Sequence, residues 1–250
     1  MTEPTPTEPA PARPASGGVG TLDSVVLDVP DLAAEASFWT ALTNGTVSTA
    51  DDDWITVVTP DRWSIALQLA PDLVAPQWPG QEHPQQAHLD LYVPDLAAAS
   101  ARAVELGATV LREGEQWITL ADPAGHPFDV CLNPETDGVT VMGTTFDCPD
   151  ASTLARFWSG VLGEPGTYDA DGVAMLGGSR PLLFQSVEGY NPPRWPDPAY
   201  PQQLHLDIEV PDLDVGEAAV LALGATRLPG QGEGFRVFAD PAGHPFCLVH

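Results

Sequence analysis

The sequence predicts an α+β fold of two tandem domains, and the first observation behind this is a repeated octapeptide. Residues 121–128 (ADPAGHPF) recur letter for letter as residues 239–246. Such an identity, about half a chain apart, indicates an internal duplication. Within the motif, Asp122 and Pro123 are typical of a turn, and Gly125 suits its left-handed position. Apolar residues follow each copy, so each turn should lead into the last strand of one half.

The second observation is the order of local patterns at the start of the chain. Residues 22–29 are rich in apolar and β-branched side chains, which favours a strand, and the Pro-Asp pair after them is typical of a helix start. Residues 32–44 carry apolar side chains at helical spacing, and Gly45 predicts the helix end. Three short strands should follow, which gives one β-α-β-β-β unit. We expect these strands at 46–48, 54–58 and 64–69.

The third observation is that this unit recurs three times. A connection rich in Pro and Gln, residues 71–86, leads to a second copy of the pattern. The second half repeats both copies, because TTFDCPD answers VVLDVPD and LHLDIEVPD answers AHLDLYVPD. In the second copy we expect a strand at 87–93, a helix at 96–106 and strands at 109–111, 116–120 and 128–132. The expected units are roughly 22–70, 87–133, 141–187 and 204–250, in domains 21–134 and 139–250, after a disordered Pro-rich tail at 1–20.

Composition narrows the possible functions. The chain has 35 acidic residues against 9 basic ones, a formal net charge of −26, and every base is an arginine. The absence of lysine excludes a Schiff-base lysine, a pyridoxal-phosphate anchor and a P-loop. So acidic a surface repels nucleic acid and anionic membranes. It would attract a cationic ligand, although solubility or salt tolerance explains it as well.

The cysteines and the N-terminal segment indicate the compartment. Three cysteines form no CxxC pair and no even framework, which favours a reducing cytoplasm over secretion. Residues 1–20 lack the apolar core of a signal peptide, and no segment reaches the apolar length of a transmembrane helix. We therefore expect a cytoplasmic protein, either a monomer or a homodimer.

Taken together, these motifs resemble the vicinal oxygen chelate superfamily, which includes glyoxalase I, bleomycin-resistance proteins and extradiol dioxygenases. The resemblance rests on the four units, the Pro-Asp helix starts and the Asp-Pro-x-Gly-His-Pro turns, and it covers residues 21–250. The Phe-Trp pair in the first helix of each half, the Gln that closes the fourth strand and the His-Leu-Asp strand look most like actinobacterial glyoxalase-like domains. The resemblance implies that the two units of each half form a cupped mixed sheet around a cleft, with helices flanking it.

The resemblance also implies where a metal would bind. In the metal enzymes of the superfamily, the ligands lie on the first and fourth strands of each paired unit. A catalytic zinc takes three protein ligands, and iron(II) oxygenases use two His and a carboxylate. Neither half completes either set, so we expect no cofactor, with a divalent metal possible only at an incomplete ligand set. The positions are Ser24, His88, Ala66 and Asp129 in the first half, and Gly143, His205, Leu183 and Cys247 in the second.

Two histidines are candidates for the polar end of a cleft. His88 and His205 lie in predicted strands and face the same side as Asp90 and Asp207, respectively. Each could anchor a ligand or transfer a proton, or be a buried histidine held by its neighbouring Asp. The histidines of the two turns should be structural, and Cys247 should be a small core residue rather than a nucleophile.

Aromatic and amide side chains complete the candidate binding residues. Trp54 and Trp117 are expected as apolar walls of the cleft. Gln68 and Gln185 are expected to supply neutral hydrogen-bonding groups from neighbouring strands. Aromatic walls with few polar groups suit a flat or bulky organic ligand.

Two functions remain open. One is a metal-independent protein that binds a small organic molecule, in the manner of bleomycin-resistance proteins. The other is a glyoxalase-type lyase or isomerase that uses a partial metal site or a His/Asp pair. We expect the working site in the first half, with His88 and Asp129 as catalytic residues, unless Asp129 points outward at a sheet edge. The connections at 75–86 and 191–203 would act as lids or pack down through a Trp.

Overall fold

The computed structural model describes residues 17–197 and 199–250, so most of the predicted tail lies outside the described residues. The last residues of this segment contact the folded part of the chain. The backbone amides of Val19 and Gly20 donate to the carbonyl of Val161, at 2.6 and 3.1 Å, and Val19 packs against the core. The prediction of disorder is therefore wrong for residues 17–20, because Val19 is an apolar side chain with a place to pack.

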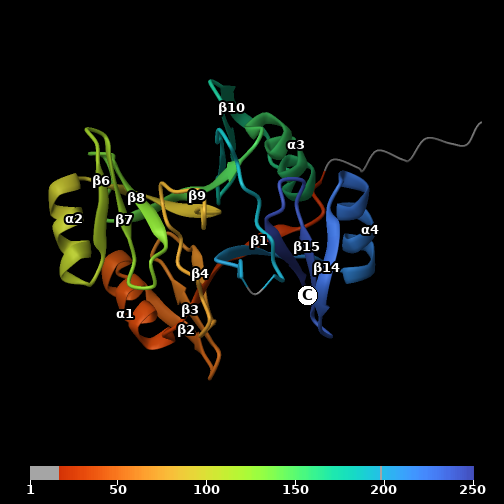
Figure 1. Ribbon diagram of the computed structural model, residues 1–250, viewed down its shortest axis with the longest axis horizontal. Coiled ribbons are helices and arrows are strands. Elements are labelled where there is room, and N and C mark those ends of the chain that lie inside the picture. Colours follow the sequence, from red (N-terminus) through yellow and green to blue (C-terminus); the bar gives the residue numbers. More distant parts are fainter. Residues whose placement is uncertain (1–16, 198) are drawn as a thin grey trace, which may run out of the picture.

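The described chain contains four consecutive β-α-β-β-β units, numbered 1 to 4 from the N-terminus (Figure 1). All the helices and strands predicted for the first half are present, with ends that move by at most a few residues. The helices are α1 (Leu32–Thr43), α2 (Leu96–Glu105), α3 (Ala151–Leu162) and α4 (Leu213–Leu223). The strands of the first half are β1 (Thr21–Val29), β2 (Thr46–Ala50), β3 (Trp54–Val58), β4 (Ser64–Leu69), β5 (Ala87–Val93), β6 (Thr109–Glu113), β7 (Trp117–Ala121) and β8 (Pro127–Leu132). Those of the second half are β9 (Thr140–Cys148), β10 (Gly166–Ala170), β11 (Val173–Leu176), β12 (Leu182–Ser186), β13 (Leu204–Glu209), β14 (Thr226–Gln231), β15 (Phe235–Ala239) and β16 (Pro245–Val249).

Each helix begins directly after the Asp of a Pro-Asp pair, as predicted. Asp31 has an extended backbone, and its Oδ1 accepts hydrogen bonds from the amides of Ala33 and Ala34, at 3.1 and 3.0 Å. These bonds satisfy amides that the helix itself leaves without partners. The other three N-caps are Asp95, Asp150 and Asp212.

The units pair into two mixed eight-stranded sheets, which confirms the α+β class, but they pair across the halves. Sheet A has the order β14-β15-β16-β13-β1-β4-β3-β2 and combines units 1 and 4. Sheet B has the order β10-β11-β12-β9-β5-β8-β7-β6 and combines units 2 and 3. The prediction that each half pairs its own two units is therefore wrong. The connections explain the difference, since residues 133–139 bring β9 directly beside β5, whereas residues 70–86 carry the chain from one sheet to the other.

The repeated octapeptide forms the predicted turn. Asp122 Oδ1 accepts from the amide of His126 at 2.8 Å, and Gly125 has a φ of 97°, which only glycine adopts at no steric cost. The ring of His126 is structural, as predicted, because its Nε2 lies 2.8 Å from the carbonyl oxygen of Asp28. The turn leads into β8, which lies between β5 and β7. β8 is the last strand of the first half, as predicted.

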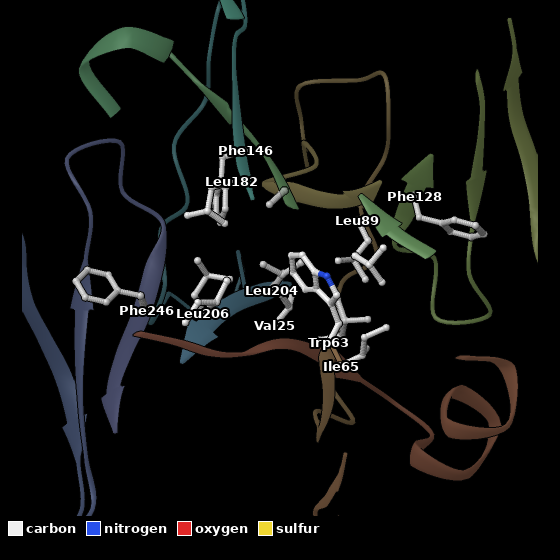
Figure 2. Packing of buried hydrophobic residues seen from close by; sticks show 14 of the residues in the cluster. Val25, Trp63, Ile65, Leu89, Phe128, Phe146, Leu182, Leu204, Leu206 and Phe246 are labelled. Carbon is white, nitrogen blue, oxygen red and sulfur yellow. The ribbon is translucent and has the colours of Figure 1, made fainter. Parts of the chain in front are cut away.

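The apolar faces of both sheets and the helices form one continuous core, in which side chains of the two sheets converge (Figure 2). Trp39 on α1 packs edge-on against Phe128 on β8, with ring centroids 5.4 Å apart, and Trp158 on α3 packs in the same way against Phe246 on β16, at 5.2 Å. These aromatic contacts of α1 and α3 join the two units of one half, although the strands pair across the halves. No helix within residues 17–197 and 199–250 is long and apolar enough to cross a membrane.

Candidate functional site

Sheet A carries a cavity on the face opposite the core. Along β13 the apolar residues face the core, so His205 and Asp207, at alternate positions, face the other side. Cys247 on β16 lies beside Asp207 in register, and Gln68 on β4 lies beside Trp54 on β3. A cavity of about 570 Å³ opens over these side chains. We call it the His205 cleft.

Aromatic side chains from three segments wall the His205 cleft. Trp54 comes from β3, Phe235 from β15 and Trp195 from the connection between β12 and β13. Phe235 is 41% exposed, so a large apolar surface faces the cavity and solvent. Trp195 of this connection packs down onto the sheet, with its ring 3.6 Å from the place of a Cβ at Gly230, which is the second of the two predicted arrangements.

The polar end of the His205 cleft is a histidine held by an acid. His205 Nε2 lies 3.5 Å from Asp207 Oδ1, and the hydroxyl of Ser24 donates to Asp207 Oδ2 at 3.4 Å. Burial alone would lower the pKa of His205, but Asp207 and Cys247 raise it to about 10. At neutral pH His205 is therefore positively charged, and it lies beside the acceptor Asp207.

A second buried acid of sheet A accepts a hydrogen bond from the connection between β12 and β13. Asp28 on β1 lies beside Gln68 in register, and Gln202 Nε2 donates to Asp28 Oδ1 at 3.0 Å. Burial raises the pKa of Asp28, although His205 and Gln202 oppose that effect. Gln202 thus fastens the end of the connection to the floor of the cleft.

Sheet B gathers the predicted catalytic pair into what we call the His88 cluster, made of His88, Asp90 and Asp129. His88 Nε2 lies 3.6 Å from Asp90 Oδ1 and 3.9 Å from Asp129 Oδ2. Burial alone would lower the pKa of His88, but Asp90 and Asp129 are the main groups that raise it to about 9. Burial raises the pKa of Asp129, more than His88 lowers it. The alternative that Asp129 points outward at an edge is wrong, because β8 is an interior strand.

The pairing across the halves changes the partners of the His88 cluster. Gln68 and Trp54, predicted to lie with His88, line the His205 cleft instead. The equivalent amide of sheet B is that of Gln185 on β12, which donates to Asp147 at 2.6 Å. Gln185 was placed on the right strand, but it shares a sheet with His88 rather than with His205.

Trp117 lies over sheet B, on the same face as the His88 cluster. It is opposite Cys131 in register, two residues along β8 from Asp129, and it is 40% exposed. The guanidinium of Arg112 lies over the indole, 6.0 Å from the ring centroid. Trp117 thus lies on the face of the histidine, with one of the chain's own cations over its ring.

Comparison with known proteins agrees with this architecture. The profile of the glyoxalase-like domain matches residues 24–131 and again residues 143–249, which together span most of the chain. The protein belongs to the glyoxalase-like domain family. The two matches correspond to the two halves, each with two β-α-β-β-β units, and they place the chain in the vicinal oxygen chelate superfamily.

Solved structures share the fold of this glyoxalase-like protein over nearly its whole length. Glyoxalase I from Zea mays superposes with a TM-score of 0.66 at 16% identity and covers 92% of each chain. A putative dioxygenase from Bacillus subtilis superposes with a TM-score of 0.60 at 12% identity, covering 93% of this chain and 86% of the other. A search of curated protein sequences gave no significant match. At these identities the similarity is one of fold, and activity has to be argued from the site.

The superfamily implies a metal, so the donor groups of the glyoxalase-like protein decide whether one fits. The sequence predicted that the ligand positions of each half lie together, and that prediction is wrong. Each sheet still brings together two of the expected donors, since Ala66, Gly143 and Leu183 offer no side-chain ligand and Ser24 donates to Asp207. The sets are Ser24, Ala66, His205 and Cys247 on sheet A, and His88, Asp129, Gly143 and Leu183 on sheet B.

Asp90 and Asp207 add a third donor to each set, within 4.8 Å of the other two, but their surroundings do not suit a metal. A metal-bound histidine normally donates its second ring N–H to an acceptor. Nδ1 of His88 and Nδ1 of His205 are both buried without a partner in the described part of the chain. On sheet B, a Cβ at Gly143 would lie 2.6 Å from Leu183 Cδ1, so an apolar side chain fills the remaining ligand positions. The donor sets do not fit the catalytic metal centre of the superfamily.

Several residues at these sites were not predicted. Phe235 lies where Trp117 lies in the other sheet, and an aromatic at the same place in the second repeat was a usable signal. Asp28 and Asp147 occupy equivalent places before the helix starts, so their recurrence in both halves was also a usable signal. Their bonds to the connections had no local signal, because Gln202 reaches Asp28 across 174 positions of sequence.

Proposed function

We propose that this glyoxalase-like protein binds a small organic molecule in the His205 cleft, without a catalytic metal. The observation that carries the proposal is the cavity of about 570 Å³ with three aromatic walls. Ligand sites are commonly cavities of roughly 300–1,000 Å³ with apolar walls and a few convergent polar groups. The size and the lining of the His205 cleft match that description.

The polar groups of the cleft would orient such a ligand. His205 and Asp207 lie at one end, and Gln68 supplies a neutral amide from β4. The aromatic walls would supply most of the buried area, while these groups select the ligand's orientation. Trp195, carried by the connection, would shield one side of the bound molecule.

A binding screen with matched variants tests the proposal. A library of aromatic and alicyclic compounds is screened by thermal shift, and hits are titrated by intrinsic tryptophan fluorescence. Phe235→Leu should weaken each hit roughly tenfold, since it removes an aromatic wall. Trp117→Leu, the equivalent change on sheet B, is the control and should leave affinity unchanged. If the control weakens binding and Phe235→Leu does not, the ligand binds elsewhere.

A second candidate function is acid–base catalysis of the glyoxalase type, by a lyase or isomerase, at the His88 cluster. The observation in its favour is that His88 Nε2 lies between two carboxylates, of which Asp129 keeps a raised pKa because of burial. A proton held there could move to or from a carbon next to a carbonyl group. Turnover of α-carbonyl substrates that His88→Ala and Asp129→Asn abolish, and His205→Ala leaves intact, would establish it. Loss of turnover in His205→Ala alone would rule it out.

The proposal also covers the compartment, the oligomeric state and the partners of the protein. All three cysteines are free, which suits a reducing cytoplasm. One chain supplies both sheets, so a monomer is sufficient to build the His205 cleft, and sedimentation would distinguish it from a homodimer. The acidic surface disfavours nucleic acid and anionic membranes as partners.

A further inference from the structure

An arginine of sheet B has no counterpart in sheet A. Arg112 lies five positions before Trp117 and covers its indole, 6.0 Å from the ring centroid. Five positions before Phe235, the equivalent aromatic of the His205 cleft, the residue is Gly230. Trp195 closes over this glycine, with its ring 3.6 Å from the place of a Cβ. One sheet therefore stacks its own cation on an aromatic wall, and the other leaves its aromatic walls uncovered.

The charged side chains around the His205 cleft are mainly negative, which favours a cationic ligand. Asp53 lies at the mouth and Asp207 on the floor, and the described lining contains no arginine. Two arginines on the adjacent strands are engaged elsewhere, because Arg227 and Arg236 both pair with Glu217. The charge of His205 is opposed by the adjacent Asp207, so the lining carries a net negative charge.

We propose that the His205 cleft selects a bulky organic cation, whose charge lies between the aromatic walls and the two carboxylates. This inference rests on the proposed function and names its ligand class. Aromatic faces attract cations through their quadrupoles, and the attraction grows when the cation leaves water. In sheet B, Arg112 lies over Trp117 at 6.0 Å from the ring centroid, so the equivalent position of this fold accommodates a cation near an aromatic ring. In the His205 cleft, the cation would have to come from the ligand.

The overall charge of −26 would also enrich any cation near the protein, so a test has to separate the two effects. Screening by salt weakens the long-range field, with a Debye length of roughly 4 Å at about 0.5 M salt. Stacking and short-range contacts inside a cleft are screened much less. Binding that persists in high salt and depends on cleft residues therefore reports the cleft itself.

Three probes of similar size and different charge provide the test. Tetraphenylphosphonium is the cation, tetraphenylborate the anion and triphenylphosphine oxide the neutral compound. Each is titrated into the full chain by calorimetry and by tryptophan fluorescence, in low salt and in about 0.5 M NaCl. We expect one cation bound per chain, at least roughly tenfold more tightly than the other two probes in both salts.

Variants locate the effect. Asp207→Asn and Phe235→Leu should each weaken tetraphenylphosphonium roughly tenfold, and Asp53→Asn roughly threefold. Asp137→Asn, which removes one charge from the exposed linker between the halves, should change nothing. Circular dichroism confirms that each variant is folded.

Each other outcome overturns the inference in a distinguishable way. If all three probes bind alike and Phe235→Leu weakens them equally, the cleft binds organic molecules without charge selection, so the proposed function stands and the cation class is wrong. If the cation binds but Asp137→Asn weakens it as much as Asp207→Asn, the surface charge alone is responsible. If the cation does not bind at all, the cation class is wrong, and the neutral library decides the proposed function separately.

Discussion

The two sheets of this protein place the same histidine and acid at the same positions and still build different sites. His88 and Asp90 on β5 are equivalent to His205 and Asp207 on β13. In both cases burial opposes protonation of the histidine and nearby acids overcome it, so the pKa rises to about 9 for His88 and about 10 for His205. The shared framework therefore fixes a protonated histidine beside an acid and does not fix what surrounds it.

The neighbouring side chains make the difference. In sheet B, the hydroxyl of Thr145, opposite His88, donates to Asp90, and Arg112 covers Trp117. In sheet A, the residue opposite His205 is Val26, and the arginine is replaced by glycine. In sheet B a hydroxyl and a guanidinium of the chain thus lie against the acid and the aromatic ring, whereas sheet A leaves aromatic surface and a cavity for a ligand. The two sites of this chain therefore differ at the positions around the polar pair.

The largest expected effect comes from separating the halves. Each sheet needs one unit from each half, so residues 17–136 alone would expose the pairing edges of β1 and β5 and part of the core. We expect no folded monomer from this fragment by sedimentation and circular dichroism, but either an unfolded chain or a dimer that pairs unit 1 of one copy with unit 2 of the other. A cooperatively folded monomer would show that the halves do not depend on each other.

Helix α1 carries Glu35 at the place of Leu154 in α3, so the two repeats also differ behind the sheets. Glu35 is 1% exposed, and neither carboxyl oxygen has a hydrogen-bond partner within the described residues. Burial and the nearby Asp122 raise its pKa from the ordinary 4.5 to about 8. The folded protein therefore holds a proton that the unfolded chain releases, so the stabilisation is lost as pH rises from 4.5 through about 8.

The variant Glu35→Leu copies the second repeat and removes this proton. We expect the free energy of unfolding of the natural protein to fall as the pH rises from about 5 to about 9, because the folded state holds a proton on Glu35 that the unfolded chain releases. Glu35→Leu should flatten that dependence and be more stable at the higher pH, as measured by denaturant unfolding. The change Glu35→Gln, which keeps the shape without the charge, is the control for packing. Equal pH slopes in all three proteins would contradict a buried titrating Glu35.

Sequence reasoning predicted much of this fold, for identifiable reasons. The helix starts were predictable because an Asp after Pro caps a helix through its own neighbours, and the turns because Asp122 and Gly125 act within five residues. The pairing of units was not predictable, because it depends on which strand pairs with β1. His205 on β13 lies opposite Val26 on β1, about 180 positions away, and no local pattern reports such a contact.

The same limit applies to the candidate site. His88 and Asp129 were placed together correctly, because both belong to one unit and their strands are adjacent. Trp54 and Gln68 were assigned to the wrong histidine, since that assignment relied on the pairing of units within a half. Residues within a unit could be predicted, and relations between units could not.

The smallest expected effect is that of metal removal, which bears on both sites at once. Each set of superfamily positions holds two donors, and Nδ1 of each histidine lacks an acceptor in the described chain. Two donors hold a divalent ion weakly. Elemental analysis of dialysed protein should find less than about 0.1 equivalents of Zn, Ni, Fe or Mn, and a chelator should leave the melting temperature unchanged. Near one equivalent of any of them would show that Asp90 or Asp207 completes a metal site.

We propose that the aromatic cleft of sheet A, and not the His88 cluster, binds the ligand. Tetraphenylarsonium, a cation of the same shape as the phosphonium probe, allows a direct measurement, because arsenic gives an anomalous X-ray signal that locates one atom in the crystal. We predict a single strong arsenic peak between Trp54 and Phe235, on the face that carries His205. A peak over Trp117 on sheet B, with none in sheet A, would contradict the account.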